Sequence, residues 1–227
     1  MKNMVVLTGA GMSAESGIKT FRDADGLWEG HDVMQVATPE GFEKNPELVL
    51  EFYNQRRRQL KEVGPNQGHL NLVKLENDFN VQVVTQNVDD LHERAGSTNV
   101  LHLHGELRKV RSSLDESLIY DWEDDLILGQ KCERGSQMRP HIVWFGEEVP
   151  MLETAIQITE KADVLVIIGT SMQVYPAASL INFINPEVPI YFIDPNPNIN
   201  QRHYSNLTVI QDGAISGTET LLKRLVY

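Results

Sequence analysis

Short runs of β-branched and aliphatic residues alternate with longer amphipathic stretches along most of the chain. The runs predict buried strands, and the stretches between them carry apolar residues at helical spacing. We expect strands at Met4–Thr8, Val81–Thr85, Val100–Leu103, Val164–Ile168, Ile190–Ile193 and Leu207–Ile210. We expect helices at Pro46–Val63, Gly68–Phe79, Leu152–Ala162, Ala177–Ile184 and Ile215–Leu225. This alternation predicts an α/β fold in which helices cover both faces of a parallel sheet.

The segment from Leu107 to Pro140 departs from this pattern, because its periodicity is weak and acidic residues gather in it. These residues are Asp115, Glu116, Asp121, Glu123, Asp124 and Asp125. The charge pattern favours an exposed surface segment, a solvated excursion from the fold, and the alternative is a small inserted module.

The composition is that of an ordinary globular protein, with 41% hydrophobic and 23% charged residues among 227. This length suits one domain, with or without a modest insertion. The 20 basic and 32 acidic residues give a net charge of −12. Such a charge argues against nucleic acid as a partner, because a duplex attracts basic surfaces.

Three further features indicate where in the cell the protein is expected. No apolar run approaches the ~20 residues that span a bilayer, so we expect no membrane partner. The chain begins with a strand-like segment instead of a charged and then apolar leader, so we expect no signal peptide. Cys132 is the single cysteine. It excludes an intrachain disulfide and fits a reducing, cytoplasmic location.

A glycine-rich turn follows the first predicted strand. It contains Gly9, Ala10, Gly11, Ser13, Ser16 and Gly17. Glycine lets backbone N–H groups approach a pyrophosphate, so the turn is a candidate dinucleotide site. Its spacing is not G-x-G-x-x-G, and a purely structural tight turn is the alternative. Beyond it, Phe21 and Arg22 offer a ring and a cation to a ligand, although Phe21 and Trp28 equally suit core packing.

Polar side chains follow the next two predicted strands. Gln86, Asn87 and Asp89 combine donors and acceptors that could hold ribose hydroxyls or a carboxamide, and one of them is expected to cap the next helix. His102 and His104 alternate, so both could face one site. We assign His104 as a general base, because imidazole titrates near neutral pH, and His102 as a packing or supporting residue.

Two later segments offer further contacts to a ligand. Gly169, Thr170 and Ser171 end a predicted strand and could bind phosphate or ribose, or form a plain turn. The apolar strand within 139–147 ends in an aromatic–glycine pair and could add to an extended peptide.

Five motifs, in this order, resemble those of the sirtuin family, the NAD-dependent protein-lysine deacylases. They are GAGMSAESGIKTFR (9–22), TQNVDDLHERAG (85–96), HGE (104–106), RPHIVWFGE (139–147) and GTS (169–171). The resemblance covers about residues 4–217, and Lys19 stands where the family usually has proline. It implies one catalytic domain over residues 1–227. The large Rossmann-like part takes about 1–35, 65–105 and 145–227, and a small inserted module takes about 36–64 and 106–144.

The resemblance also implies a reaction. NAD and an acylated lysine, carried by a protein segment in extended conformation, meet between the two parts and give free lysine, nicotinamide and O-acyl-ADP-ribose. The implied catalytic residues are His104, Asn87 and Asp89. The implied NAD-binding residues are Gly9, Ala10, Gly11, Ser13, Ser16, Gly17, Phe21, Arg22, Trp28, Gln86, Asn87, Asp89, Gly169, Thr170, Ser171, Asp194, Asn196 and Ala214. The implied substrate-binding residues are Tyr53, Arg56, Val143, Phe145, Gly146, Glu147, Val174 and Tyr175.

Alternative functions of such a site are mono-ADP-ribosyl transfer, NAD hydrolysis and NAD sensing by a scaffold. The intact set of Asn87, Asp89 and His104 argues against the scaffold. Asp194 stands where the family has asparagine, and its charge near phosphate leaves its role open.

Tyr53 and Arg56 lie three residues apart in a predicted helix, and therefore on one face. They resemble the Tyr-x-x-Arg pair of sirtuins that accept succinyl and malonyl groups, where the cation binds the acyl carboxylate. The alternative is that Arg56 belongs to a basic surface patch. We expect desuccinylase and demalonylase activity beside deacetylation.

One family feature is missing. Sirtuins usually hold a structural zinc with four cysteines in the small module, and here Ser112 and Ser113 stand at the first pair. Only Cys132 remains, so we expect no zinc and a module held by packing.

Overall fold

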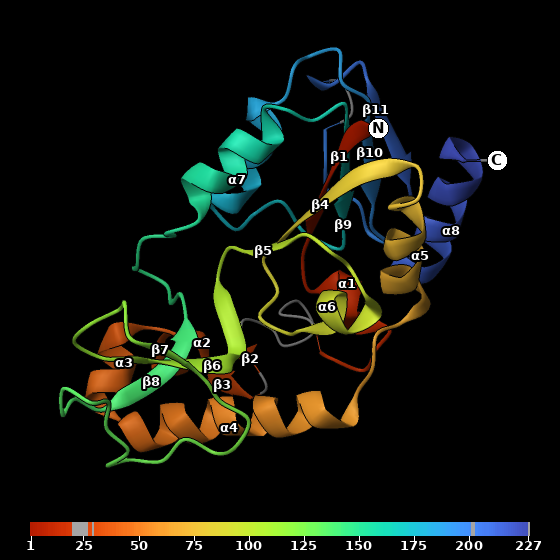
Figure 1. The fold of residues 1–227 in the computed structure, drawn as a ribbon. Coiled ribbons are helices and arrows are strands. Elements are labelled where there is room, and N and C mark those ends of the chain that lie inside the picture. The colour runs from red at the N-terminus through yellow and green to blue at the C-terminus, as the bar shows by residue number, and fades with distance from the viewer. Residues whose placement is uncertain (20–26, 29, 201–202, 227) are drawn as a thin grey trace.

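The structure is a computed structural model, and it describes residues 1–19, 27–28, 30–200 and 203–226. Its centre is a six-stranded parallel sheet with the order β11-β10-β9-β1-β4-β5 (Figure 1). The strands are β1 (Lys2–Thr8), β4 (Phe79–Thr85), β5 (Val100–His102), β9 (Val164–Ile168), β10 (Ile190–Ile193) and β11 (Leu207–Ile210). All six predicted strands are therefore confirmed, with ends that differ by at most two residues. The predicted α/β fold is correct.

The core lies on both faces of this sheet. Met4 and Val6 of β1 face one apolar cluster, while Val5 and Leu7 face the other. The first cluster is covered by α5 (Gln67–Leu75) and α8 (Ala214–Leu225), and the second by α7 (Leu152–Thr159) and a 3₁₀ helix, η2 (Ala177–Phe183). Burial on both faces explains the unbroken apolar run Met4–Leu7 within β1.

A smaller unit lies beside the carboxyl ends of the sheet strands (Figure 1). Its antiparallel sheet has the order β7-β6-β8. The strands are β6 (Gly105–Ser112), β7 (Ile119–Asp121) and β8 (Met138–Ile142), and the helices beside them are α2 (Val33–Val36), α3 (Pro39–Lys44) and α4 (Pro46–Glu62). The remaining elements are α1 (Gly11–Ala14), β2 (Leu27–Trp28), β3 (His31–Asp32) and α6 (Leu91–Ala95). The residue boundaries expected for the two parts stay a prediction.

The acidic segment is part of this smaller unit. Val110 and Leu126 are fully buried in its core, whereas Glu123, Asp124 and Asp125 lie on its surface. The inserted module was thus the correct alternative, and the surface excursion that charge patterning favoured was wrong. Of the six acidic residues only Asp121 lies in a strand, and the other five lie in the connections between strands, so the charges marked the loops and not the sheet that they join.

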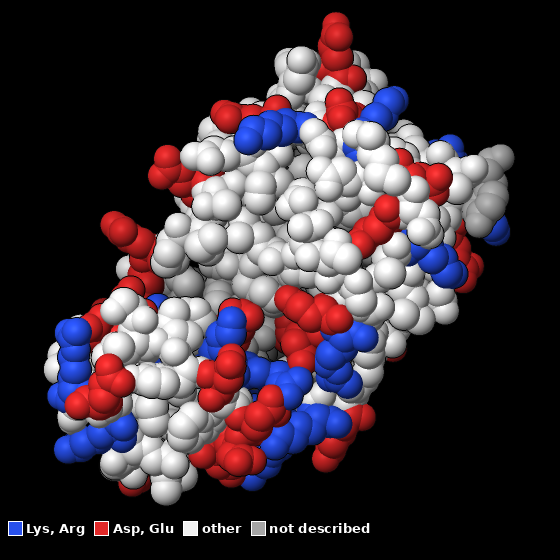
Figure 2. Space-filling model, viewed as in Figure 1, with Lys and Arg blue, Asp and Glu red and all other residues white. Residues whose placement is uncertain are grey.

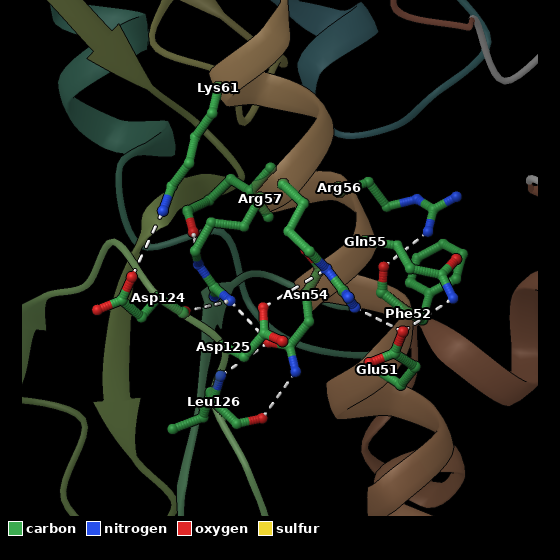
Figure 3. A network of polar contacts seen from close by, with 12 residues as sticks. Glu51, Phe52, Asn54, Gln55, Arg56, Arg57, Lys61, Asp124, Asp125 and Leu126 are labelled. Atoms are coloured by element: carbon green, nitrogen blue, oxygen red, sulfur yellow. Dashed lines mark hydrogen bonds and ion pairs between the residues drawn. The ribbon is translucent and has the colours of Figure 1, made fainter.

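Helix α4 is tied to this segment by a buried amide. Asn54 accepts a hydrogen bond from the Leu126 N–H (2.8 Å) and donates one to the Leu126 carbonyl (3.0 Å). Arg57 adds bonds from Nε to the Leu107 carbonyl (3.1 Å) and from Nη1 to Asn54 Oδ1 (2.8 Å). Figure 3 shows Asn54 and Arg57 directed toward Leu126, whereas Arg56 points to the other side of the helix. The inward contacts of α4 therefore orient its opposite side.

Residues at the position expected for zinc form a small hydrogen-bonded cluster. Ser112 Oγ lies 2.8 Å from Ser136 Oγ, and Cys132 Sγ lies 3.1 Å from Ser136 Oγ. Ser112 Oγ also accepts from the N–H groups of Leu114 (3.2 Å) and Asp115 (3.1 Å). One thiol and two hydroxyls do not fit structural zinc, which needs four nitrogen or sulfur ligands. Among the described residues, no group of three or more His, Cys, Asp or Glu could hold a metal ion.

None of the helices that the structure describes combines the length and the apolar character that crossing a bilayer requires.

Replacing Asn54 by leucine removes the amide that satisfies Leu126 while keeping the volume of the side chain. An unsatisfied buried backbone group costs about 1–3 kcal/mol, so Asn54→Leu should lower the free energy of unfolding by about 2 kcal/mol or more. The measurement is urea denaturation followed by circular dichroism. The neighbouring Gln55 is exposed, and Gln55→Leu serves as the control with little effect. Equal losses in the two variants would contradict this account of the α4 contact.

The serine–cysteine cluster predicts that the protein folds without metal. Purified protein should contain far less than one zinc ion per chain by elemental analysis. A strong chelator should leave its melting temperature unchanged, because hydroxyl hydrogen bonds need no ion. Stoichiometric zinc, or a chelator-dependent melting temperature, would show that the small sheet is held differently.

Candidate active site

A cavity of about 770 Å³ opens between the carboxyl ends of the parallel strands and the smaller unit. This volume is within the range of sites for small molecules and cofactors. In open parallel sheets, ligands bind at this edge, where the strand order reverses. The reversal lies between β1 and β9, because β4 and β5 extend the sheet on one side and β9, β10 and β11 on the other.

The loops after β1 and β9 touch at this point through their backbones. The Gly11 N–H donates to the Gly169 carbonyl (2.8 Å), and the Gly9 N–H donates to the Ile168 carbonyl (3.0 Å). A Cβ atom on Gly11 would lie 2.6 Å from Gly169 Cα, closer than atoms can approach. Gly169 also has φ of +61°, which favours glycine. The predicted glycine turn is therefore a close contact of two loops at the floor of the cavity.

Ser13, Asn87 and Asp89 form a buried polar network on one wall. The Ser13 hydroxyl donates to Asp89 Oδ2 (3.0 Å) and accepts from Asn87 Nδ2 (3.2 Å). Asp89 Oδ1 also accepts from the Leu91 N–H at the start of α6 (3.2 Å). Burial raises the pKa of Asp89, although these hydrogen bonds oppose the shift. The N-cap of α6 is Asp90, whose side chain makes no capping bond, so none of the three polar residues is the cap that was expected. Asp89 lies one residue before the cap, where its carboxylate binds the Leu91 N–H and orients Ser13.

His104 lines the cavity with one ring nitrogen already committed. Its Nδ1 lies 3.1 Å from the Gln86 carbonyl oxygen, which can only accept, so Nδ1 carries the proton. The neutral ring therefore keeps Nε2 as the nitrogen that can accept a proton. Burial lowers the pKa of His104, so this neutral form predominates near neutral pH. The arrangement has the tautomer and protonation state of a general base.

The other predicted residues fall into three groups. Those that line the same cavity are Gly9, Ala10, Trp28, Tyr53, Arg56, Gln86, Val143, Phe145, Gly146, Glu147, Thr170, Ser171, Val174, Tyr175, Asp194 and Asn196. Ser16, Gly17, His102 and Ala214 are absent from its walls; Ser16 Oγ instead accepts from Asn66 Nδ2 (3.1 Å). Phe21 and Arg22 lie outside the described residues.

Tyr53 and Arg56 reach the cavity from one face of α4. Tyr53 is fully buried, and burial strongly raises the pKa of its phenol, which stays neutral. The Arg56 guanidinium donates to the Phe52 carbonyl (2.6 Å) and lies 3.8 Å from the centre of the Phe52 ring. Figure 2 shows interleaved acidic and basic side chains over the smaller unit. Arg58 belongs to that surface, since it pairs with Glu51 at 2.6 Å.

Sequence reasoning missed Trp144, which supports Tyr53. Its Nε1–H donates to the Tyr53 hydroxyl oxygen (2.9 Å), so the phenol proton remains to be donated elsewhere. The Arg139 guanidinium stacks 3.3 Å from the Trp144 ring centre and also binds Glu147 (2.6 Å). Glu147, expected to contact substrate, has its carboxylate held by Arg139 and Arg111, which lies 3.2 Å away. The sequence showed an aromatic residue at this position, but it did not indicate that the indole N–H binds Tyr53.

Comparisons with known proteins place this sequence beside one protein family. Residues 9–176 match the Sir2 family. A protein of Helicobacter pylori named NAD-dependent protein deacylase is 57% identical over 226 residues, which cover 100% of this chain and 96% of that protein. A protein of the same name from Bacteroides thetaiotaomicron is 54% identical over 232 residues, covering 100% of this chain and 99% of that protein.

Solved structures agree with the sequence relatives. A complex of a Sir2 homologue with NAD has a TM-score of 0.88 at 39% identity, over 98% of this chain and 89% of that chain. A complex of a mutant Sir2 with a p53 peptide and NAD has a TM-score of 0.80 at 28% identity, over 97% and 92% of the two chains. With the family matched over most of its length and relatives aligned along the whole of it, this chain belongs to the Sir2 family.

Proposed function

We propose that this protein is an NAD-dependent protein-lysine deacylase that removes acetyl, succinyl and malonyl groups. The observation that carries the proposal is His104, held as a neutral Nδ1–H tautomer in the cavity that also contains the Ser13–Asn87–Asp89 network. A scaffold that only senses NAD has no need for a buried base with an available Nε2.

The residues at the floor of the cavity suit NAD. A side chain at Gly9 or Gly11 would collide with Gly169 or Thr170, so both lining positions stay without one, and a pyrophosphate would contact their backbone. Gln86 donates from Nε2 to Thr170 Oγ1 (3.1 Å), which brings the ends of β4 and β9 together beside this floor. When bound, NAD supplies a ribose carbon from which nicotinamide departs. Asn87, Asp89 and Ser13 would hold the adjacent ribose and carboxamide.

His104 acts after nicotinamide has left. Its Nε2 accepts the proton of a ribose hydroxyl, and Nδ1–H stays bound to the Gln86 carbonyl, which stabilises the charged ring. The ribose oxygen would then bond to the acyl carbon, and one water would be consumed as the amide C–N bond breaks, giving lysine and O-acyl-ADP-ribose beside the nicotinamide already released. Mono-ADP-ribosyl transfer and NAD hydrolysis share the departure of nicotinamide but yield no acyl-ADP-ribose. Mass spectrometry of a reaction with acyl-peptide and NAD therefore distinguishes the three activities.

The substrate segment would lie in extended conformation along 143–146. The N–H groups of Val143 and Phe145 already donate to the carbonyls of His104 and Ala37, both at 2.9 Å. The Trp144 N–H donates to Glu147 Oε2 (2.7 Å). An added peptide would therefore donate its own N–H groups to carbonyl oxygens of this segment. Exposed Phe145 and Tyr175, which both line the cavity, offer apolar surface to such a peptide.

Tyr53 and Arg56 would select acidic acyl groups. A carboxylate that enters a partly dry cavity loses hydration and binds poorly unless it finds a cation. Arg56 supplies that cation, and Tyr53 supplies a donor because Trp144 already occupies its oxygen as an acceptor. The absence of nucleic-acid and membrane partners, the cytoplasmic location and the domain boundaries stay predictions.

Replacing His104 by tyrosine tests the base. Deacylation should fall by about 10²–10⁴-fold, because the proton acceptor is lost, while NAD binding measured by calorimetry stays within a few-fold of wild type. In the wild type, turnover should also fall as the pH drops through the lowered pKa of His104, below about 6.5. Near-normal turnover of His104→Tyr would remove the assignment.

Replacing Arg56 by methionine tests acyl selectivity. Loss of a charge partner of this kind costs about 2–5 kcal/mol. The Michaelis constant for succinyl- and malonyl-lysine peptides should therefore rise by roughly 30-fold to several thousand-fold, with little change for acetyl-lysine. Arg58 lies two residues along the same helix on the exposed surface, so Arg58→Met is the matched control. Equal effects on all acyl groups would leave a deacetylase without acidic-acyl selectivity.

A further inference from the structure

His102 is the one histidine of the HLH sequence that the cavity does not use. Its ring lies between two oxygen atoms: Nδ1 is 2.9 Å from the Asn87 carbonyl oxygen, and Nε2 is 2.8 Å from Glu93 Oε1. A carbonyl and a carboxylate can only accept, so both ring nitrogens must donate. Both can donate only in the imidazolium form. The geometry thus fixes His102 as a cation.

The surroundings of the ring agree with a charge. The side chain of His102 is 9% exposed, and burial alone would favour the neutral form. The Glu93 carboxylate outweighs burial, with smaller contributions from the Asn87 carbonyl and Glu106, and the pKa of His102 is raised. Glu93, on α6, has a lowered pKa because burial is overcome by its bond to His102. The other charged or titratable groups that face this pair are Asp89, His92 and Lys109.

The carbonyl that His102 holds belongs to a catalytic residue. The Asn87 N–H donates to Thr85 Oγ1 (3.0 Å), and its side-chain Nδ2 donates to Ser13 Oγ (3.2 Å). With His102 bound to its carbonyl, both backbone polar groups of Asn87 are hydrogen-bonded. The backbone at Asn87 therefore cannot rotate without breaking one of these bonds. The next peptide upstream is held in the same way, since His104 binds the Gln86 carbonyl.

A chain of hydrogen bonds fixes the other side of Asn87. Thr8 Oγ1 donates to Thr85 Oγ1 (2.8 Å) and lies 3.0 Å from His92 Nε2, which must then donate to it. Burial and the neighbouring His69 and His102 lower the pKa of His92, which stays neutral. Two adjacent residues of α6 thus act on Asn87. His92 is linked to the Asn87 N–H through Thr8 and Thr85, and Glu93 is linked to the Asn87 carbonyl through His102.

We infer that His102 is a positioning residue: as an imidazolium braced by Glu93, it holds the Asn87 carbonyl and thereby sets the orientation in which Asn87 meets NAD. The kinetic tests of this inference rest on the proposed deacylase function. The spectroscopic test needs no catalysis, so the inference and the proposed function can fail separately.

Two substitutions separate the two bonds of the ring. The amide nitrogen of asparagine occupies about the place of Nδ1, and that of glutamine about the place of Nε2. His102→Asn keeps a donor for the Asn87 carbonyl, whereas His102→Gln keeps one for Glu93 only. We expect kcat of His102→Asn within about threefold of wild type. For His102→Gln we expect kcat lowered by roughly 10–100-fold, since small misplacements near the reacting atoms cost this much. A residue that served stability alone would give the two variants equal kcat, and that result would overturn the inference.

The pH profile tests the charge. As the pH rises through the raised pKa of His102, the ring keeps one proton, and the carboxylate of Glu93 draws it to Nε2. The bond to Asn87 is then lost and kcat falls. In Glu93→Gln the amide can donate to Nε2, so a neutral ring keeps Nδ1–H on Asn87, and this alkaline fall should disappear. The exposed Glu219 on α8 provides the control, and Glu219→Gln should retain the fall. An alkaline limb that Glu93→Gln leaves unchanged would contradict the assigned charge.

Nuclear magnetic resonance reads the ring directly. In long-range ¹H–¹⁵N spectra at pH 7, the histidine signal that His102→Gln removes should show two protonated nitrogens, and Glu93→Gln should convert it to one. A neutral ring in the wild type would overturn the inference, whatever the enzyme assays show.

Discussion

The contact between the loops after β1 and β9 is the constraint on which the site depends. These loops leave the sheet in opposite directions, and a hollow forms above the place where they separate. The hollow has a floor only because Gly11 and Gly169 approach to hydrogen-bond distance, 2.8 Å between nitrogen and oxygen. A side chain at Gly11 would collide with the Gly169 backbone, so the loop that carries Thr170 and Ser171 into the cavity would have to shift. The polar walls are positioned relative to this floor.

On the walls, the direction of hydrogen bonding matters as much as proximity. Trp144 can only donate, so Tyr53 must accept from it and keeps its own proton for a ligand. The Gln86 carbonyl can only accept, which leaves His104 basic at Nε2. In both cases a partner outside the reacting atoms determines what the functional side chain can offer. The chemistry of the cavity is therefore set by Trp144 and by the backbone carbonyl of Gln86 in the loop after β4.

The fold could be predicted from the sequence because a parallel strand buried on both faces needs an unbroken apolar run. Val164–Ile168 is such a run, and all five of its residues are buried. Gly11, Asn87 and His104 were predicted from their places just after strand ends, and all three line the cavity, while their roles stay predictions. The helix expected at Gly68–Phe79 ends at Leu75, because the N–H groups of residues 76–78 bond three residues back in turns and Phe79 already begins β4. Trp144 and the charge on His102 could not be predicted, since both depend on partners that only the folded chain brings near: Tyr53 precedes Trp144 by 91 positions. The cluster of Ser112, Cys132 and Ser136 likewise combines segments that carry no joint pattern in the sequence.

The central place of β1 has a consequence for synthesis on the ribosome. Met4 pairs with Val81 on one side and with Val164, 160 residues later, on the other. At about 5–20 residues per second, the apolar strand therefore waits on the order of ten to thirty seconds before its second neighbour leaves the exit tunnel. Through that interval one edge of β1 stays open, and pairings this distant in sequence form slowly. Unpaired strand edges are places where chains associate, so β1 is exposed to such contacts until β9 has been synthesised.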